Sequence, residues 1–272
     1  MVRQNNTMKN IISSAVIFIV IVSCQHNNKT VIDVEESEWG INSTLVLIDN
    51  STHKILYEYN QKIANHRVAP CSTFKIWNTL IANECGIISN ENEIIYKWDG
   101  KERSIKNWNK DLSLKEAFQV SCVPAFQDIA FRINPERMQH WINYIDYGDK
   151  NINAGIKLFW LPEKNRKTIL ISPKEQAILL DNLISNNLNF SAESIHLLKN
   201  IMKSTVTNHG TLYGKTGSAT NEHGNYIMGW YVGFIESKDK VIVFAALING
   251  ENITGKHVKE KIEKLFIRYN LL

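Results

Sequence analysis

The sequence predicts an α/β protein of the α+β type, whose central and mostly antiparallel sheet is built from N- and C-terminal segments. Strand patterns occur at both ends of the chain, as a hairpin over 43–59 and as three strands at about 211–216, 226–235 and 241–247. Signals for helix starts fill the middle. Because the two groups of strands bury their apolar faces best in one sheet, we expect the helical middle region to pack against that sheet.

Each element has a local signal. In the first hairpin, the turn-forming residues 49–52 separate two apolar, β-rich runs. In the middle, a capping box begins at Ser113, a cap followed by proline begins at Asn134, and both devices coincide at Ser172. The C-terminal strands are separated by Gly217, by Gly224 and by a turn at 238–240, and a last helix is expected over about 257–269.

The N-terminus has the layout of a signal peptide. Two basic residues and no acid precede an apolar run of about a dozen residues, 11–22, which is shorter than the about 20 needed to span a bilayer. We therefore expect residues 1–23 to be removed on export, 24–40 to form a tether, and 41–272 to form a single catalytic domain. The tetrad ending at Cys24 is similar to a bacterial lipoprotein processing site, so we expect a periplasmic protein with a lipid on Cys24; simple cleavage near Ser23 is the alternative.

Composition excludes several classes of function. The 272 residues are 44% hydrophobic, enough for a sizeable core, and the net charge of +4 is not gathered into a basic stripe, so nucleic-acid binding is not expected. Membrane contact is expected only through the lipid anchor. None of the histidines has a metal-ligand spacing, so no metal is expected. The cysteines at 71, 85 and 122 form no disulfide framework and are interpreted as small buried hydrophobes.

The main chemical signal is Ser72 followed by Lys75 at the start of an apolar helix. Residues three apart share a helical face, so the amine can reach the hydroxyl, and the free N–H groups of a first turn favour an anion there. In an apolar pocket the lysine loses its proton and can act as a base. The spacing alone is weak, because Ser51/Lys54 and Ser237/Lys240 share it as turn or surface residues.

Two further motifs follow in order. Lys215-Thr216-Gly217 lies on an expected strand, where Gly217 would let a substrate approach the backbone and the strand edge would pair with a peptide-like group. An ordinary strand end is the alternative. Ser121-x-Val123 is less specific and is supported by its place between the other two.

Five motifs occur in a fixed order and carry a family resemblance. They are Ser72-Thr73-Phe74-Lys75, Ser121-Cys122-Val123, Tyr147-Gly148-Asp149, Phe159-Trp160-Leu161 and Lys215-Thr216-Gly217. Over about residues 40–272 the chain resembles the penicillin-recognising serine enzymes, most closely the class D (oxacillinase-type) β-lactamases. Class A enzymes carry Ser-Asp-Asn where this chain has Ser-Cys-Val.

The resemblance implies roles for these residues. Ser72 would form an acyl-enzyme with β-lactam antibiotics, penicillins above all. Lys75, carbamylated by carbon dioxide or bicarbonate and held by the Trp160 indole, would be the general base for acylation and deacylation. No other cofactor is implied. Ser121 and Lys215 would relay a proton to the leaving nitrogen. The remaining contacts with substrate would come from Val123, Thr216, Gly217, Ser218 and Lys259, and the N–H groups of Ser72 and Ser218 would form the oxyanion hole.

The chain departs from the family pattern at two positions, and two alternative functions remain open. The family usually has asparagine at Asp149, and a carboxylate-binding arginine where Lys259 stands; lysine lacks the two-pronged geometry of arginine. A β-lactam sensor domain that is acylated without turnover has the same motifs, and the stretch 250–256 resembles such sensors. A cell-wall carboxypeptidase or transpeptidase is less favoured, because no accessory domain is seen.

Overall fold

A six-stranded sheet, in the order β2-β1-β8-β7-β6-β5, forms the centre of the computed structural model, which describes residue 32 and residues 36–272. Every neighbouring pair in it is antiparallel. Its strands are β1 (Ser43–Asp49), β2 (Lys54–Tyr59), β5 (Lys203–Val206), β6 (Gly210–Thr220), β7 (Tyr226–Ser237) and β8 (Val241–Asn249). Because β1 pairs with β8, the two ends of the chain share one sheet, which confirms the predicted architecture.

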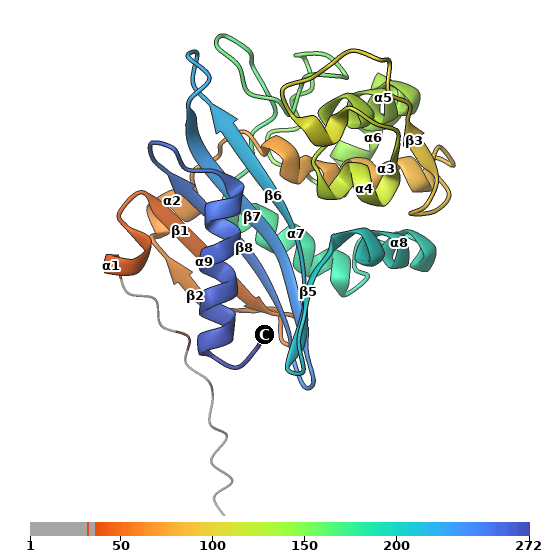
Figure 1. Ribbon diagram of the computed structural model, residues 1–272. Helices are drawn as coiled ribbons and strands as arrows, with labels where there is room; N and C mark the ends of the chain where they lie inside the picture. The colour runs from red at the N-terminus through yellow and green to blue at the C-terminus, as the bar shows by residue number, and fades with distance from the viewer. Residues whose placement is uncertain (1–31, 33–35) are drawn as a thin grey trace, which may run out of the picture. The chain divides into compact units, whose positions relative to one another are not determined.

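Helices cover both faces of this sheet (Figure 1). They are α1 (Glu36–Trp39), α2 (Gln61–Ala64), α3 (Lys75–Glu84), α4 (Leu114–Gln119), α5 (Val123–Ile133), α6 (Pro135–Tyr144), α7 (Pro173–Ile184), α8 (Ala192–Met202) and α9 (Gly255–Arg268), with the 3-10 turns η1 (Cys71–Phe74) and η2 (Lys106–Trp108). A short two-stranded sheet joins β3 (Ile94–Tyr96) to β4 (Leu112–Ser113). Contacts place α9 against β6, β7 and β8, whereas α7 contacts β1, β7 and β8 and η1 contacts β6.

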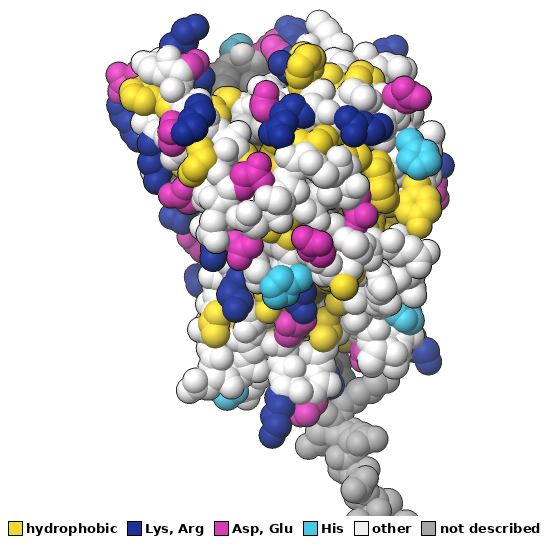
Figure 2. All heavy atoms as spheres, turned by 90° about the vertical axis from the view of Figure 1, so that its right-hand side faces the viewer, with side chains coloured by type: hydrophobic (Ala, Val, Ile, Leu, Met, Phe, Trp, Pro, Cys, Tyr) yellow, Lys and Arg dark blue, Asp and Glu magenta, His cyan; other side chains and the backbone are white. Residues whose placement is uncertain are grey.

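Two apolar cores follow from this layering. One lies under α9, where Val258, Ile262 and Phe266 meet the strands. The other is larger and joins the opposite face of the sheet to the helical middle region. The face that the middle region presents in Figure 2 carries acidic and basic side chains interspersed with apolar ones. No helix in the described part of the chain combines the length and apolar character that crossing a bilayer requires.

The predicted helix starts are found where the caps indicated. Ser113 and Ser172 each accept a bond from the backbone three residues on and close a capping box, and Asn134 caps α6. The pattern did not indicate α8, β5 or the β3–β4 pair. β6 also runs on to Thr220, so Gly217 does not end the strand as predicted. The strand continues past this point because residues 217–220 go on pairing with β7.

The N-terminal predictions are mostly outside the described residues. This holds for the signal peptide at 1–23, for Cys24 and for most of the tether at 24–40. Within that tether, however, Glu36–Trp39 form α1, and Ile32 and Trp39 are buried in the core under α9. The folded part therefore begins before residue 40, because a buried tryptophan fixes the end of the segment to the body.

Candidate active site

The turn that carries Ser72 lies where β6 meets the helical region. Pro70 precedes a single 3-10 turn, Cys71–Phe74, and α3 begins at Lys75, so Ser72 lies in a tighter turn than the α-helical one expected. Cys71 takes a left-handed conformation with φ 53°. This geometry brings the predicted pair together: Lys75 Nζ donates to Ser72 Oγ at 2.8 Å.

Lys75 is fully buried, and its surroundings favour the neutral amine. Burial lowers the pKa of Lys75 to about 7, an effect opposed by the thiols of Cys122 and Cys71. The ring of Phe126 lies 5.3 Å from Nζ. Burial also raises the pKa of the Cys71 thiol to about 12, so this neighbour of Ser72 stays protonated and is a poor nucleophile. At neutral pH about half of the lysine is therefore in the neutral form that a base for Ser72 needs.

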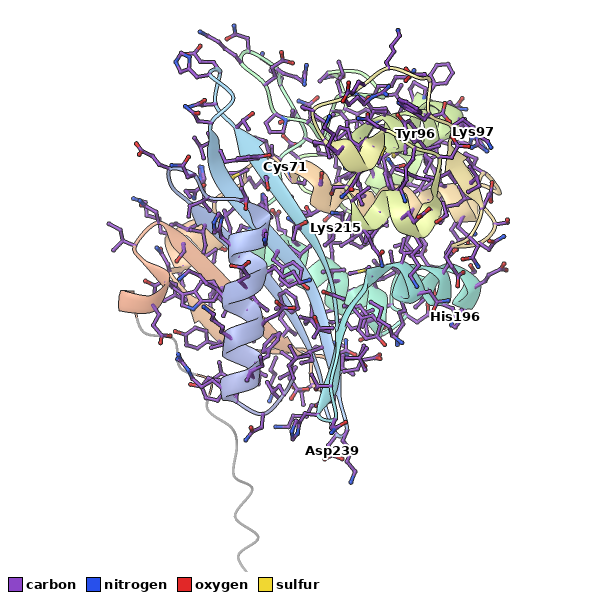
Figure 3. The ribbon with its side chains drawn as sticks, in the orientation of Figure 1. Cys71, Tyr96, Lys97, His196, Lys215 and Asp239 are labelled. Atoms are coloured by element: carbon purple, nitrogen blue, oxygen red, sulfur yellow. The ribbon has the colours of Figure 1, made fainter. Side chains whose placement is uncertain are left out.

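A second hydroxyl–amine pair adjoins the first. Ser121 lies between α4 and α5 with φ 56°, and Lys215 Nζ donates to its Oγ and, at 3.0 Å, to the carbonyl of Thr216. Burial, followed by the charge of Lys75, holds the pKa of Lys215 well below its usual range. Lys215 and Cys71 are seen at the junction of sheet and helices in Figure 3. Val123, two residues after Ser121, begins α5 and is partly exposed.

Trp160 has a buried donor without a partner. The side chain is fully buried and stacks on Phe74 with ring centroids 5.7 Å apart, while Phe159 packs edge-on against both rings. Its Nε1 has no hydrogen-bond partner among the residues that the structure describes. An orphaned buried N–H costs about 1–3 kcal/mol, so a site with such a donor fits an anionic acceptor.

The loop at Tyr147-Gly148-Asp149 packs against the Ser72 turn through Phe74. The Tyr147 ring meets the Phe74 ring edge-on at 5.3 Å. Asp149 Oδ1 accepts from the backbone N–H groups of Leu170, at 2.9 Å, and Asn151, at 3.2 Å. Asp149 is solvent-exposed, but these two bonds fix its side chain in the loop. Since both bonds use one oxygen as acceptor, asparagine would supply the same contacts.

The strand residues 215–218 alternate between two surroundings. Lys215 and Gly217 face the helical region, and Thr216 and Ser218 face α9. The absence of a side chain at Gly217 serves the Ser72 turn, because a Cβ there would lie 3.1 Å from the carbonyl oxygen of Pro70 and 3.3 Å from Cys71 Cβ. This differs from the predicted reason, approach of substrate. Ser218 Oγ accepts from the N–H of Gly255 at 2.9 Å, which ties the strand to α9.

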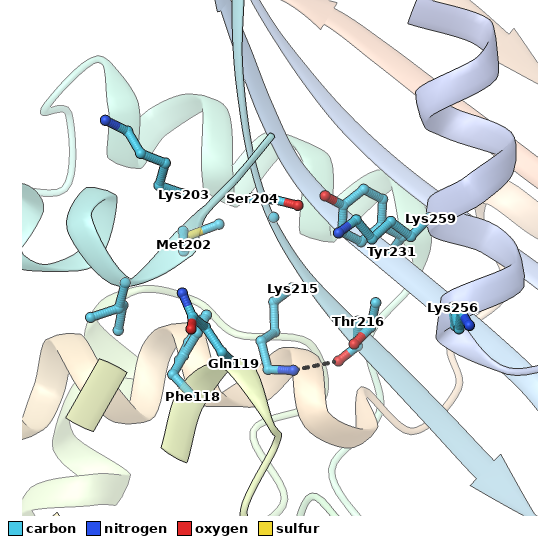
Figure 4. Close-up of a pocket in the computed structure, with 12 residues that line it drawn as sticks. Phe118, Gln119, Met202, Lys203, Ser204, Lys215, Thr216, Tyr231, Lys256 and Lys259 are labelled. Carbon is cyan, nitrogen blue, oxygen red and sulfur yellow. Dashed lines mark hydrogen bonds between the residues drawn. The ribbon is translucent and has the colours of Figure 1, made fainter. Parts of the chain in front are cut away.

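Lys259 lines a cavity of about 450 Å³ beside Lys215 and Thr216. Lys256 and Lys203 also line it, and within the described part of the chain no acidic side chain does. In Figure 4 Lys215 is bonded to Thr216, and Lys259 approaches from α9 beside Tyr231. Lys259 Nζ forms an ion pair with Glu263 at 3.7 Å, which is too long for a hydrogen bond, so its N–H donors can still bond an anion.

A second cavity, of about 520 Å³, adjoins the turn from the other side. It is lined by Ala69, Ala219 and Met228, and an ion pair between Lys164 and Glu222 joins the two loops that border it. Among the described residues, no group of three or more His, Cys, Asp or Glu side chains is placed to hold a metal ion.

Two residues that hold the Ser72 turn were missed. Trp230 Nε1 donates to the carbonyl of Ala69 at 3.0 Å, and Gln176 Oε1 accepts from Thr73 Oγ1 at 3.1 Å. For Gln176 the available signal was a polar residue on the apolar face of α7. Such residues are common in helices without functional meaning.

The fold and the serine–lysine pair define an active-serine domain of the transpeptidase type. Residues 43–267 match the family described as penicillin binding protein transpeptidase domain. The chain is 36% identical over 219 residues to β-lactamase OXA-19 of Pseudomonas aeruginosa, covering 80% of each protein. It is 32% identical over 242 residues to the probable β-lactamase YbxI of Bacillus subtilis, covering 89% of this chain and 87% of that protein.

Solved structures agree. The structure of BPu1 β-lactamase matches with a TM-score of 0.80 at 35% identity, over 88% of this chain and 97% of that one. The chain belongs to the class D β-lactamase family. A similarity to the regulatory protein BlaR1 of Bacillus licheniformis, 32% identity over 202 residues, covers 74% of this chain but 32% of that protein.

Proposed function

We propose that the chain hydrolyses β-lactam antibiotics, penicillins above all, through an acyl-enzyme on Ser72. The observation that carries this is the 2.8 Å contact between Lys75 Nζ and Ser72 Oγ, with the lysine buried and its pKa lowered to about 7. The base carried by Lys75 takes the hydroxyl proton while Oγ attacks the lactam carbonyl. The relatives that match most of this chain are named β-lactamases, and this supports the choice of substrate.

The developing oxyanion would be held by backbone N–H groups of Ser72 and Ser218. One such donor is typically worth about 2.7–4 kcal/mol in the transition state. Collapse of the tetrahedral intermediate breaks the C–N bond, and the nitrogen takes a proton from Ser121, which is replenished by Lys215 through the bond between them. Thr216, Ser218 and Lys259 would bind the ring carboxylate, with Val123 beside Ser121 bordering the acyl group.

Deacylation needs a base that is free after acylation. We propose that Lys75 is carbamylated, because only a neutral amine reacts with carbon dioxide and burial favours that form. The carbamate would supply a carboxylate-like base for acylation and again for deacylation. The unpartnered Nε1 of Trp160 is the donor that would hold it, and this fit supports the proposal.

Mass spectrometry tests the function directly. After mixing with benzylpenicillin, we expect an adduct on Ser72 whose amount falls with time. A chromogenic cephalosporin should be turned over many times, and the rate should rise when bicarbonate is added. Lys75→Ala should nearly abolish deacylation. An unchanged deacylation rate in that variant would remove Lys75 from the role of base.

A sensor domain is the second candidate, favoured by the similarity to BlaR1 and by Lys259 in place of arginine. A sensor would give one equivalent of product and an adduct that persists. The identity to β-lactamases over most of their own length supports turnover instead.

We also propose that the protein is exported to the periplasm and anchored by a lipid on Cys24. The basic start, the apolar run at 11–22 and the tetrad ending at Cys24 support this. Fractionation of cells tests it: Cys24→Ala should move the protein from the membrane to the soluble periplasmic fraction. Equal distribution of the two proteins would argue for simple cleavage.

A further inference from the structure

The Ser72 turn is anchored on both of its sides. Before Ser72, the carbonyl of Ala69 accepts from Trp230 of β7 at 3.0 Å, and the carbonyl of Pro70 accepts from the N–H of Thr73 at 3.2 Å. After Ser72, the hydroxyl of Thr73 lies 2.7 Å from the carbonyl of Pro70 and 3.1 Å from Gln176 Oε1. Thr73 therefore bridges the two sides, and Gln176 is the contact that reaches it from outside the turn.

Gln176 projects from a firmly held part of α7. Ser172 and Glu175 close a capping box at the start of this helix, and Glu175 also pairs with Arg67. The Gln176 side chain is 2% exposed, and its Nε2 has no hydrogen-bond partner. Such a buried donor costs about 1–3 kcal/mol, whereas an apolar side chain of the same size at this position would cost nothing of this kind. Stability alone does not account for an amide here.

We propose that Gln176 is a positioning residue for the reaction at Ser72. Its Oε1 shares the single Thr73 hydroxyl proton with the carbonyl of Pro70, which lies on the other side of Ser72 and also accepts from the Thr73 N–H. The orientation of the Ser72 N–H and hydroxyl toward substrate is set by this bridge between α7 and the turn. The inference rests on the proposed role of Ser72 as nucleophile.

The rate of acylation tests the inference, since it is measurable whether or not the acyl-enzyme turns over. In Gln176→Leu we expect acylation by benzylpenicillin to slow at least tenfold, measured on the folded protein by quenched mass spectrometry. Leu180→Val is the matched control: Leu180 is buried one turn further along α7, so this variant should unfold at a lower temperature and still acylate within twofold of wild type. Equal rates for Gln176→Leu and wild type would overturn the proposal.

A double-mutant cycle separates positioning from general destabilisation. Because Gln176 acts through Thr73, adding Gln176→Leu to Thr73→Val should slow acylation little further, so the two effects should not multiply. Gln176→Glu keeps an acceptor at the same place and should restore acylation to within threefold of wild type. Multiplying effects, or no rescue by glutamate, would contradict the bridge. If wild type itself forms no adduct, it is the proposed function that fails.

Discussion

Lys75 donates to Ser72 across 2.8 Å from a position with no solvent exposure at all. In water an ammonium would be the stable form and would have no lone pair to accept a proton. Here desolvation outweighs the opposing effect of the neighbouring thiols and brings the pKa of Lys75 down to about 7. Contact and burial together make the pair reactive, and each has a measurable consequence.

The first consequence is the pH dependence of acylation. The free amine and its carbamate both require Lys75 to lose its proton, and the pKa of Lys75 is about 7, so the rate should be nearly constant above pH 8 and fall about tenfold per unit well below pH 7. Stopped-flow acylation with benzylpenicillin between pH 5 and pH 9 measures this. A rate that keeps rising toward pH 10 would mean that Lys75 titrates like a solvated lysine.

The second consequence concerns stability. The folded pKa of about 7 lies below the ordinary 10.5, so between these values the unfolded chain binds more protons, and this group makes stability rise with pH. Lys75→Met removes the titration but keeps an unbranched, apolar stem. We expect the variant to be more stable than wild type by several kcal/mol at pH 7 and by much less at pH 10, measured by urea unfolding. An equal difference at both pH values would contradict the lowered pKa.

Trp160 gives a prediction about bicarbonate. Trp160→Phe keeps an aromatic ring against Phe74 but removes the buried N–H that has no partner. Because the proposed carbamate serves both steps, acylation and deacylation should both slow, deacylation about tenfold or more, and both should need a higher bicarbonate concentration for half their maximum. Trp77→Phe, in the same aromatic cluster, is the control and should leave the bicarbonate dependence unchanged. A normal dependence in Trp160→Phe would separate this indole from the proposed carbamate.

The sequence was most informative where function depends on local spacing. Ser72 and Lys75 are three residues apart, so a single helical turn brings them together, and the caps at Ser113 and Ser172 act within three residues of themselves. The pairing of Lys215 with Ser121 spans 94 positions, and it was reached through motif order and resemblance, which local pattern does not supply.

Other features depend on packing between distant segments. Gly217 is needed because the carbonyl of Pro70 lies against it, and Gln176 matters because Thr73 is its neighbour across 103 positions. Neither partner is visible from the residues around the glycine or the glutamine. β5 and α8 were missed for a related reason: their stability comes mainly from contacts with β6, α3 and α4, and their own pattern is weak.

Gly148 gives a prediction with an internal control. It has φ 53°, and a Cβ there would lie 2.0 Å from the carbonyl oxygen of Leu170. Gly224 has φ 80°, but nothing lies within 4 Å of its Cβ position. Gly224→Ala should therefore cost only the conformational penalty, about 1 kcal/mol. Gly148→Ala should cost at least about 3 kcal/mol, because the loop must move as well. Similar losses of unfolding free energy in the two variants would show that the close contact is not rigid.

Lys259 stands where the family usually has an arginine that binds the substrate carboxylate. It lines the cavity beside Lys215 and Thr216, and its ammonium is not hydrogen-bonded to Glu263. Lys259→Ala should raise the KM for benzylpenicillin about three- to tenfold with little change in kcat, because the carboxylate is bound equally in the ground and transition states. Lys259→Arg should lower KM by restoring a two-pronged contact. Lys264, exposed on the same helix and away from this cavity, is the control, and Lys264→Ala should behave as wild type. If Lys259→Ala and Lys264→Ala have the same KM, the carboxylate is held by the strand residues alone.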